Sequence, residues 1–110
     1  MKYVPDCQDI VWLEFTPQAG REIQKTRPAL IISPKAYNAA AGLALCMPIT
    51  SKVKGYPFEV IIADASVRGA VLCDQLRSLD WRVRKAQFIS RLDDEAFIEV
   101  IEKFKVLLPA

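Results

Sequence analysis

One short apolar run, Ala29-Leu30-Ile31-Ile32, constrains the fold of this chain more than any other feature. Four residues are too few for a core helix and two of them are β-branched, so the run predicts a strand covered on both faces. Arg27 stands at the start of this strand. Pro28 favours an extended Arg27, so the guanidinium leaves the sheet in a restricted direction, next to the carboxylate of Glu22. This corner suits either a reactive site or an ordinary ion pair at a strand end.

Further strand-like runs follow one another at close spacing. Asp9 to Phe15 alternates between two sets of apolar residues, which predicts a strand buried on one face and partly covered on the other. The other candidate strands are residues 43–49, 58–62, 70–73 and 76–79, with 84–89 as one more. Segments rich in Gly, Pro and polar residues separate them, at 16–26, 53–57 and 64–69. Short strands joined by turns favour a small, mainly β barrel of the α+β class over a parallel sheet with crossover helices.

Two helices complete the expected fold. Ser33 is expected to cap a brief helix with Pro34 at its first position, and Gly42 ends it. A longer C-terminal helix is expected to begin after Asp93 and to pack on the barrel. Its apolar face would consist of Phe97, Val100, Ile101, Phe104 and Leu107. The run Asp93-Asp94-Glu95 could be imagined as metal ligands, but a cap with acidic first-turn residues explains it fully.

Composition sets limits on function. The 110 residues are 52% hydrophobic, which is enough for one domain over residues 1–110 with a core that needs no disulfides. A net charge of only +2 means that any affinity for nucleic acid must come from Lys and Arg clustered on one face. The sequence has neither a signal-peptide core nor an apolar run of membrane-spanning length, so we expect a cytoplasmic protein that does not enter a membrane.

Cysteine and histidine usage excludes several chemistries. Cys7, Cys46 and Cys73 are odd in number and far apart, which argues against a disulfide framework and a zinc site; the last two are expected to be buried. The chain has no histidine, so an imidazole base and Ser-His or Cys-His nucleophile pairs are impossible. Catalysis would have to use carboxylates, Arg, Lys, Thr, Ser or Tyr, and no metal or cofactor is expected.

Polar groups follow several of the apolar runs, where strand ends could converge on one rim. They are Glu22 with Arg27, Thr50 with Ser51, and Asp74 with Gln75. A carboxylate can take a proton, an Arg can stabilise a phosphoryl charge and a Thr can hydrogen-bond to it, which are the needs of phosphodiester cleavage.

Two further segments could bind the substrate. The loop after Thr50 would display Lys52, Lys54 and Tyr56, and the segment 77–85 interleaves basic residues with a Trp, as a single-strand binding surface would. The candidates in that second segment are Arg77, Ser78, Trp81, Arg82 and Arg84. Each feature also has an ordinary explanation as a strand end, a turn or a solvated edge.

The motifs gain weight from their order along the chain. They are Arg27 through Pro34, Tyr37-Asn38, Pro48 through Ser51, Gly55 through Val60, and Asp74-Gln75 continuing to Ser78, Asp80 and Arg84. Across nearly the whole chain they resemble the MazF/PemK family of toxin endoribonucleases, and the MazF side more closely. The resemblance implies an SH3-like barrel with small helices, a homodimer, metal-independent cleavage of single-stranded RNA, and inhibition by a cognate antitoxin protein.

The resemblance also implies roles for particular residues. Arg27 and Thr50 match the catalytic Arg and Thr of the family, and Glu22 matches the acidic residue of the preceding loop. The implied reaction is attack of the 2′-hydroxyl on the adjacent phosphorus, giving a 2′,3′-cyclic phosphate and a 5′-hydroxyl. The PemK side has a loop His and an Arg where this chain has Arg21 and Leu72. Asp74 therefore stays open between a catalytic acid and a residue that orients the loop or substrate.

Two rival interpretations remain. A toxin of the same fold could poison a topoisomerase by binding, which would not need Arg27 and Thr50. A non-catalytic SH3-like module could bind a protein tail through the Trp and Arg surface. Cleavage of RNA in the presence of a chelator distinguishes these from a nuclease.

Overall fold

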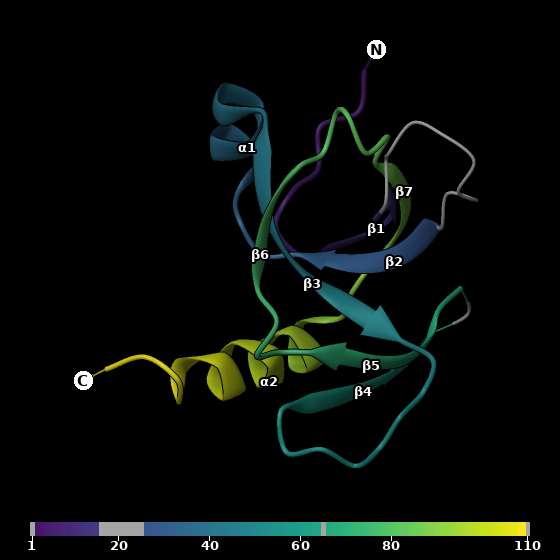
Figure 1. Cartoon of the computed structure of the whole chain (residues 1–110), viewed down its shortest axis with the longest axis vertical. Coiled ribbons are helices and arrows are strands. Elements are labelled where there is room, and N and C mark those ends of the chain that lie inside the picture. The colour runs from purple at the N-terminus through teal and green to yellow at the C-terminus, as the bar shows by residue number, and fades with distance from the viewer. Residues whose placement is uncertain (1, 16–25, 65, 110) are drawn as a thin grey trace.

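The computed structural model describes residues 2–15, 26–64 and 66–109. In this part of the chain seven strands and two helices follow in the order β1 (Asp9–Glu14), β2 (Thr26–Ile31), α1 (Lys35–Ala41), β3 (Leu43–Thr50), β4 (Glu59–Ala63), β5 (Arg68–Leu72), β6 (Arg77–Asp80), β7 (Gln87–Arg91) and α2 (Asp94–Lys105). The strands pair antiparallel in the order β4-β5-β3-β2-β1-β7, and β6 pairs with the first half of β3. The expected mainly β fold is confirmed as a curled half-barrel sheet with two helices (Figure 1).

The long strand β3 curls the sheet. Its first half pairs with β6, its middle with β2 and its last two residues, Ile49 and Thr50, with β5. The β4 and β5 pair is thereby carried away from β1, β2 and β7, and α2 lies along β4 (Figure 1). The end of β3 is therefore the place where the two parts of the sheet meet.

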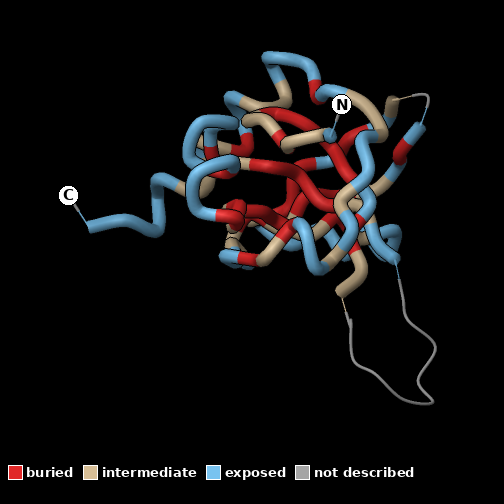
Figure 2. Tube along the Cα trace, turned by 90° about the horizontal axis from the view of Figure 1, so that it is seen from above, coloured by how far each residue is buried: buried red, intermediate tan, exposed pale blue. Residues whose placement is uncertain are grey.

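The predicted double-sided burial of β2 is confirmed, because Ala29, Leu30 and Ile31 are fully buried. Figure 2 shows that the buried stretches of the chain gather in the middle of the molecule. Leu30 belongs to a cluster that faces β4, β5 and α2, whereas Ala29 and Ile31 belong to a second cluster that includes Trp81. Alternate residues of one strand thus serve two cores, which is why β2 reads as a continuous apolar run. This double anchoring fixes the direction in which β2 presents Arg27.

The helices are confirmed with corrections at their ends. Asp93 caps α2 by accepting from the Ala96 N–H at 3.0 Å, and Gly42 ends α1 with φ of 73°. The expected Ser33 cap is wrong. Pro34 is the cap residue, and the Ser33 hydroxyl instead accepts from the Leu45 N–H at 2.9 Å, which ties the entrance of α1 to β3.

The bounds of three strands also differ from the predicted ranges. The strand expected at 84–89 is β7 at 87–91, and the first two residues of that expected strand lie in a turn. The strands expected at 70–73 and 76–79 are β5 at 68–72 and β6 at 77–80. Leu107 lies beyond α2 and is 45% exposed, so it is not part of the packing face.

The prediction that Cys46 and Cys73 are buried is confirmed, at 2% and 0% exposure. Burial raises the pKa of the Cys46 thiol to about 12 and that of Cys73 to about 11. Both therefore stay protonated at neutral pH and act as small core residues rather than nucleophiles. All three cysteines, including Cys7, are free thiols.

Candidate active site

Arg27 and Thr50 lie together at the end of the β2 and β3 pair. The β2 and β3 pairing runs from Ile31 opposite Cys46 to Ala29 opposite Pro48, so Arg27 and Thr50 both lie just beyond the paired stretch, at the same end. Both residues line an open cavity of about 420 Å³. The remaining lining residues are Thr26, Ser51 and Lys52. The register of an antiparallel pair thus joins the two catalytic candidates, although 23 positions separate them in the sequence.

The backbone beside Thr50 is held from two directions. The Thr50 Oγ1 accepts from the Lys52 N–H at 3.0 Å, and Thr50 pairs with Ala70 of β5. A Cβ atom on Gly69 would lie only 2.2 Å from the Thr50 carbonyl oxygen. Because only glycine permits this approach, Gly69 sets how closely β5 supports the end of β3.

A second cavity of about 430 Å³ continues the first beyond Thr50 and Lys52. Its other lining residues are Lys54, Tyr56, Glu59, Leu72 and Gln75. We call the two adjoining cavities the Thr50 groove. The groove combines a guanidinium, two ammonium groups, three aliphatic hydroxyls and a phenol, which are suited to an anionic polymer that carries aromatic bases.

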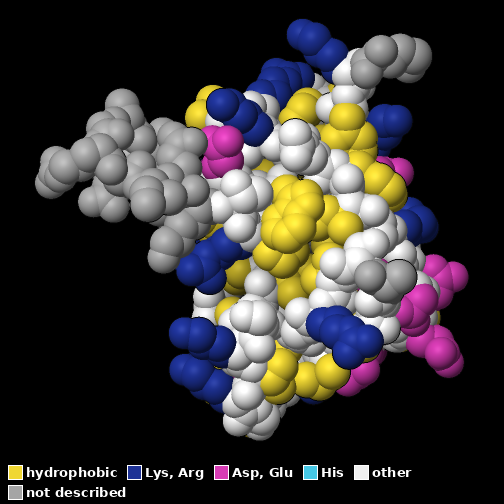
Figure 3. Space-filling view, turned by 90° about the vertical axis from the view of Figure 1, so that its right-hand side faces the viewer, with side chains coloured by type: hydrophobic (Ala, Val, Ile, Leu, Met, Phe, Trp, Pro, Cys, Tyr) yellow, Lys and Arg dark blue, Asp and Glu magenta, His cyan; other side chains and the backbone are white. Residues whose placement is uncertain are grey.

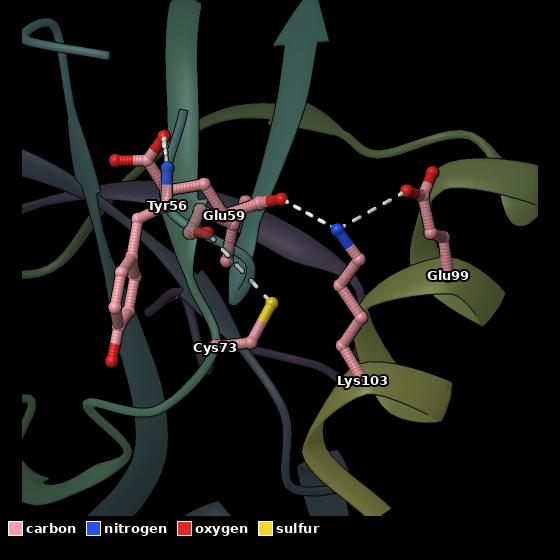
Figure 4. Close-up of polar contacts among 6 residues, drawn as sticks. Tyr56, Glu59, Cys73, Glu99 and Lys103 are labelled. Atoms are coloured by element: carbon pink, nitrogen blue, oxygen red, sulfur yellow. Dashed lines mark hydrogen bonds and ion pairs between the residues drawn. The ribbon is translucent and has the colours of Figure 1, made fainter. Parts of the chain in front are cut away.

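The loop that carries Lys54 and Tyr56 is organised by a buried carboxylate. Glu59 is 7% exposed and accepts from the backbone N–H groups of Lys54, Gly55 and Tyr56 at 3.0 to 3.3 Å. Figure 4 shows the bond from Tyr56. The Lys103 ammonium of α2 donates to the Glu59 carbonyl oxygen at 2.8 Å. Three converging N–H groups compensate the burial of this charge, so the loop is held in one form.

Asp74 is hydrogen-bonded to Tyr56 rather than placed beside Arg27. The Tyr56 hydroxyl donates to Asp74 Oδ2 at 2.8 Å, and this bond, with the carboxylate's charge, raises the pKa of Tyr56. In the described part of the chain no group donates to the other, buried oxygen of Asp74. Gln75 beside it is exposed and lines the groove.

The segment 77–85 lies outside the Thr50 groove as lined by described residues. Trp81 is buried rather than displayed, and its contact with RNA stays a prediction. Its ring is 7% exposed in the second core cluster, and its indole N–H donates to the Asn38 carbonyl oxygen at 2.9 Å. The fold uses this Trp as an interior anchor, because an indole can satisfy its one donor while burying a large area.

The arginines next to Trp81 bind backbone carbonyl oxygens. Arg82 lies 4.8 Å from the centre of the Trp81 ring and donates to the Ala39 carbonyl oxygen at 3.1 Å. Arg84 donates to the carbonyl oxygens of Glu14 and Phe15. Arg77 and Ser78 are exposed on β6. That these four residues contact RNA stays a prediction.

The predicted general base, Glu22, lies outside the described residues. The structure therefore describes two members of the predicted catalytic set, Arg27 and Thr50, and brings them together.

A third cavity, of about 360 Å³, opens beside Arg27 and contains residues that the sequence did not single out for function. Its lining residues are Trp12, Thr26, Arg27, Pro28, Ile49, Ser51, Ser66, Val67 and Arg68. Trp12 could have been found as the aromatic residue on the less covered face of an alternating strand. Glu59 could have been found as a lone charge between apolar neighbours, whereas Gly69 gave no signal beyond its place after a turn.

Two other kinds of feature are absent from the described residues. Among them no three His, Cys, Asp or Glu side chains gather where they could hold a metal ion. None of the described helices is both long and apolar enough to span a membrane.

Comparisons with known proteins agree with this architecture. Residues 6–108 match the sequence model of the PemK-like, MazF-like toxins of type II toxin-antitoxin systems. The chain is 39% identical over 107 residues to the endoribonuclease toxin MazF of Escherichia coli K12, covering 97% of this chain and 96% of that protein. It is 31% identical over 104 residues to the endoribonuclease PemK of Escherichia coli, covering 89% and 78% of the two chains.

A crystal structure of MazE-MazF from Deinococcus radiodurans superposes with a TM-score of 0.90 at 48% identity, covering 96% of each chain. The higher identity to MazF than to PemK agrees with the side of the family that the motifs predicted. The chain therefore belongs to the family of PemK-like, MazF-like toxins of type II toxin-antitoxin systems.

Proposed function

We propose that this chain, an endoribonuclease toxin of a type II toxin-antitoxin system, cleaves single-stranded RNA in the Thr50 groove without a metal ion. The single observation that carries the proposal is that Arg27 and Thr50, at one end of the antiparallel β2 and β3 pair, line one open cavity. The Arg27 guanidinium and the Thr50 hydroxyl belong to lining residues of this cavity, where an anionic substrate could reach both. Their combination of charge and hydroxyl is that of a phosphoryl-binding site.

In the proposed reaction the ribose 2′-hydroxyl attacks the adjacent phosphorus, and the bond to the 5′-oxygen of the next nucleotide breaks. Arg27 stabilises the charge that develops on the phosphorane oxygens. The Thr50 oxygen already accepts the Lys52 N–H, which leaves its O–H free to donate to a phosphoryl oxygen. Glu22 takes the 2′-hydroxyl proton, and the leaving 5′-oxygen takes a proton from a water molecule to become a 5′-hydroxyl, after which the resulting hydroxide takes the proton back from Glu22.

The rest of the groove would hold the strand. Lys52 and Lys54 contact flanking phosphates, while Tyr56 and Gln75 face the nucleotides beyond the cut. Asp74 then serves as a positioning residue, because it holds the Tyr56 hydroxyl. Stable duplex is expected to be a poor substrate, since the A-form stack restricts both base recognition and in-line attack.

The proposal includes a homodimer in the cytoplasm that a cognate antitoxin silences. The solved relative that pairs MazE with MazF supports such a partner. An antitoxin segment carrying carboxylates and apolar anchors would suit the cationic edge of the groove at Arg27, Lys52 and Lys54. One surface would then bind either RNA or antitoxin.

The deciding assay mixes the purified protein with a long single-stranded RNA in excess EDTA and maps the cut ends. We expect cleavage to continue, with 2′,3′-cyclic phosphate and 5′-hydroxyl ends. Loss of cleavage on chelation that magnesium restores would contradict the mechanism. A folded protein that cuts no RNA under any condition would favour the topoisomerase-binding or protein-tail alternatives.

A further inference from the structure

We propose that Trp12 is the stacking platform of a nucleobase subsite, and that this subsite holds the base next to the phosphate bound by Arg27. The inference rests on the proposed function, because it takes single-stranded RNA as the ligand. It adds a base-binding position on β1 to a site built from β2, β3 and the 51–57 loop.

The exposure of Trp12 sets it apart from its strand. Ile10, Val11 and Leu13 of β1 are at most 1% exposed, whereas Trp12 is 38% exposed. Trp12 pairs with Pro28 on one side and Gln87 on the other, and it shares the sheet face of Ile10. Trp12 is therefore partly covered within the sheet and partly open to a ligand.

The open part faces the third cavity, which has Arg27 in common with the Thr50 groove. The cavity lies between the β1 and β2 pair and the turn that joins β4 to β5. Its volume of about 360 Å³ falls within the roughly 300–1,000 Å³ typical of small-ligand sites. Figure 3 looks onto this side of the molecule, where an exposed hydrophobic patch has Lys and Arg side chains around it.

The lining chemistry fits a nucleotide. Arg27 and Arg68 supply two guanidinium groups, and among the described residues neither forms an ion pair with a carboxylate. Ser51 and Ser66 supply hydroxyl groups that can donate or accept at a base edge. An aromatic ring and two cations in one cavity suit a nucleobase with its flanking phosphates, since every base has a π-face and stacking tolerates any sequence.

The far wall of the cavity is held in place before any ligand arrives. Asp64 Oδ1 accepts from the Ser66 and Val67 N–H groups at 2.7 Å each, and the Ser90 hydroxyl of β7 donates to Asp64 Oδ2 at 3.0 Å. These bonds tie the turn after β4 to the strand beside β1. A subsite fixed in this way loses little conformational entropy on binding.

The first test measures whether RNA covers Trp12. The chain has two tryptophans, and replacing the buried one by Phe (Trp81→Phe) leaves Trp12 as the only indole. Once the cut is mapped, an RNA with a 2′-methoxy group at the attacking nucleotide binds without being cleaved. We expect this RNA to quench Trp12 fluorescence and to protect it from acrylamide. Binding without either change would overturn the subsite.

The second test uses kinetics in the wild-type background. Trp12→Ala is expected to raise KM by about 10- to 100-fold with a smaller change in kcat, and Trp12→Phe to restore most of the loss. Phe88→Ala is the matched control, because Phe88 is 52% exposed on neighbouring β7 and does not line the cavity. Thermal melting of each variant separates loss of the platform from loss of the fold.

The sharpest arm pairs each variant with RNAs that lack one base near the cut. One abasic position should weaken binding to the wild type as much as Trp12→Ala does, and should cost nothing further in Trp12→Ala. Additive effects at every position would overturn the assignment. So would protection of Trp12 by the antitoxin alone and not by RNA, which would mark a protein-binding cavity. If cleavage persists in EDTA but Trp12 variants behave as wild type, only the subsite fails; if no RNA is cut, the proposed function fails.

Discussion

The loop 51–57 and the turn 81–85 both set cationic side chains beside an aromatic ring, but the structure gives those cations different partners. In the loop, Lys52 and Lys54 line an open groove, and a buried Glu59 holds the backbone between them. In the turn, Arg82 stacks on Trp81 and binds a backbone carbonyl oxygen. The comparison teaches that a basic and aromatic sequence pattern can form a binding surface only where the Lys and Arg side chains are not already hydrogen-bonded to backbone carbonyl oxygens.

The largest expected effect compares one arginine from each region. Arg27→Ala should lower the cleavage rate by about 10²–10³-fold, because it removes a donor that acts on the transition state. Arg82→Ala should change the rate far less and should instead cost roughly 0.5–1 kcal/mol of stability, the usual value of an exposed cation–π contact. Single-turnover cleavage and thermal melting of both variants provide the measurements. Equal losses of activity would mean that the turn also contacts RNA, as the sequence predicted.

Gly69→Ala tests whether backbone geometry fixes the groove. The new methyl group would meet the Thr50 carbonyl oxygen at 2.2 Å, so β5 or the end of β3 must shift. We expect a loss of about 1–3 kcal/mol in the free energy of unfolding, typical of overpacking, together with reduced cleavage. Gly55→Ala is the control, because a Cβ atom at that position would meet no other atom within 4 Å, although its φ of 76° adds strain. Full activity in folded Gly69→Ala would show that Thr50 needs no such support.

The sequence predicted the fold better than it predicted the site. Alternation and apolar runs placed β1, β2 and β3, because burial is periodic along a strand. The meeting of Arg27 and Thr50 in one cavity depends on the pairing of β2 with β3, which the local sequence does not contain. The burial of Trp81 was not predicted, because its neighbours in the sequence are polar while its contact with α1 is long-range. Gly69 and the cavity around Trp12 depend on close approaches between strands, so only the folded chain reveals them.

Salt dependence sharpens the comparison of the two basic segments. Removing one ammonium group that neutralises a phosphate of single-stranded RNA should reduce the slope of log binding constant against log salt by about 0.7. We expect that reduction for Lys52→Ala and for Lys54→Ala. Lys85→Ala in the turn should leave the slope unchanged, because its ammonium lies 3.9 Å from the Glu14 carboxylate and outside the groove. Binding of uncleavable RNA over a range of salt concentrations measures the slope for all three variants. An equal reduction for Lys85→Ala would show that the turn contacts phosphates as the loop does.

The smallest expected effect concerns the aromatic residue of each region. Tyr56 has a hydroxyl that titrates, and its hydrogen bond to Asp74 raises the pKa of Tyr56 above its ordinary value of about 10. Because the folded-state pKa is the higher one, this bond stabilises the fold below about pH 10, and the contribution is lost as pH rises through the raised pKa. Tyr56 is exposed, so the change in stability should be slight.

The titration of Tyr56 can be followed by phenolate absorbance, as the difference between wild type and Tyr56→Phe. This difference should give a raised midpoint, which Asp74→Ala should return toward about 10. Trp81 has no group that titrates, so Trp81→Phe should leave the alkaline titration unchanged. A Tyr56 midpoint that does not respond to Asp74→Ala would remove the bond that is proposed to position the phenol in the groove.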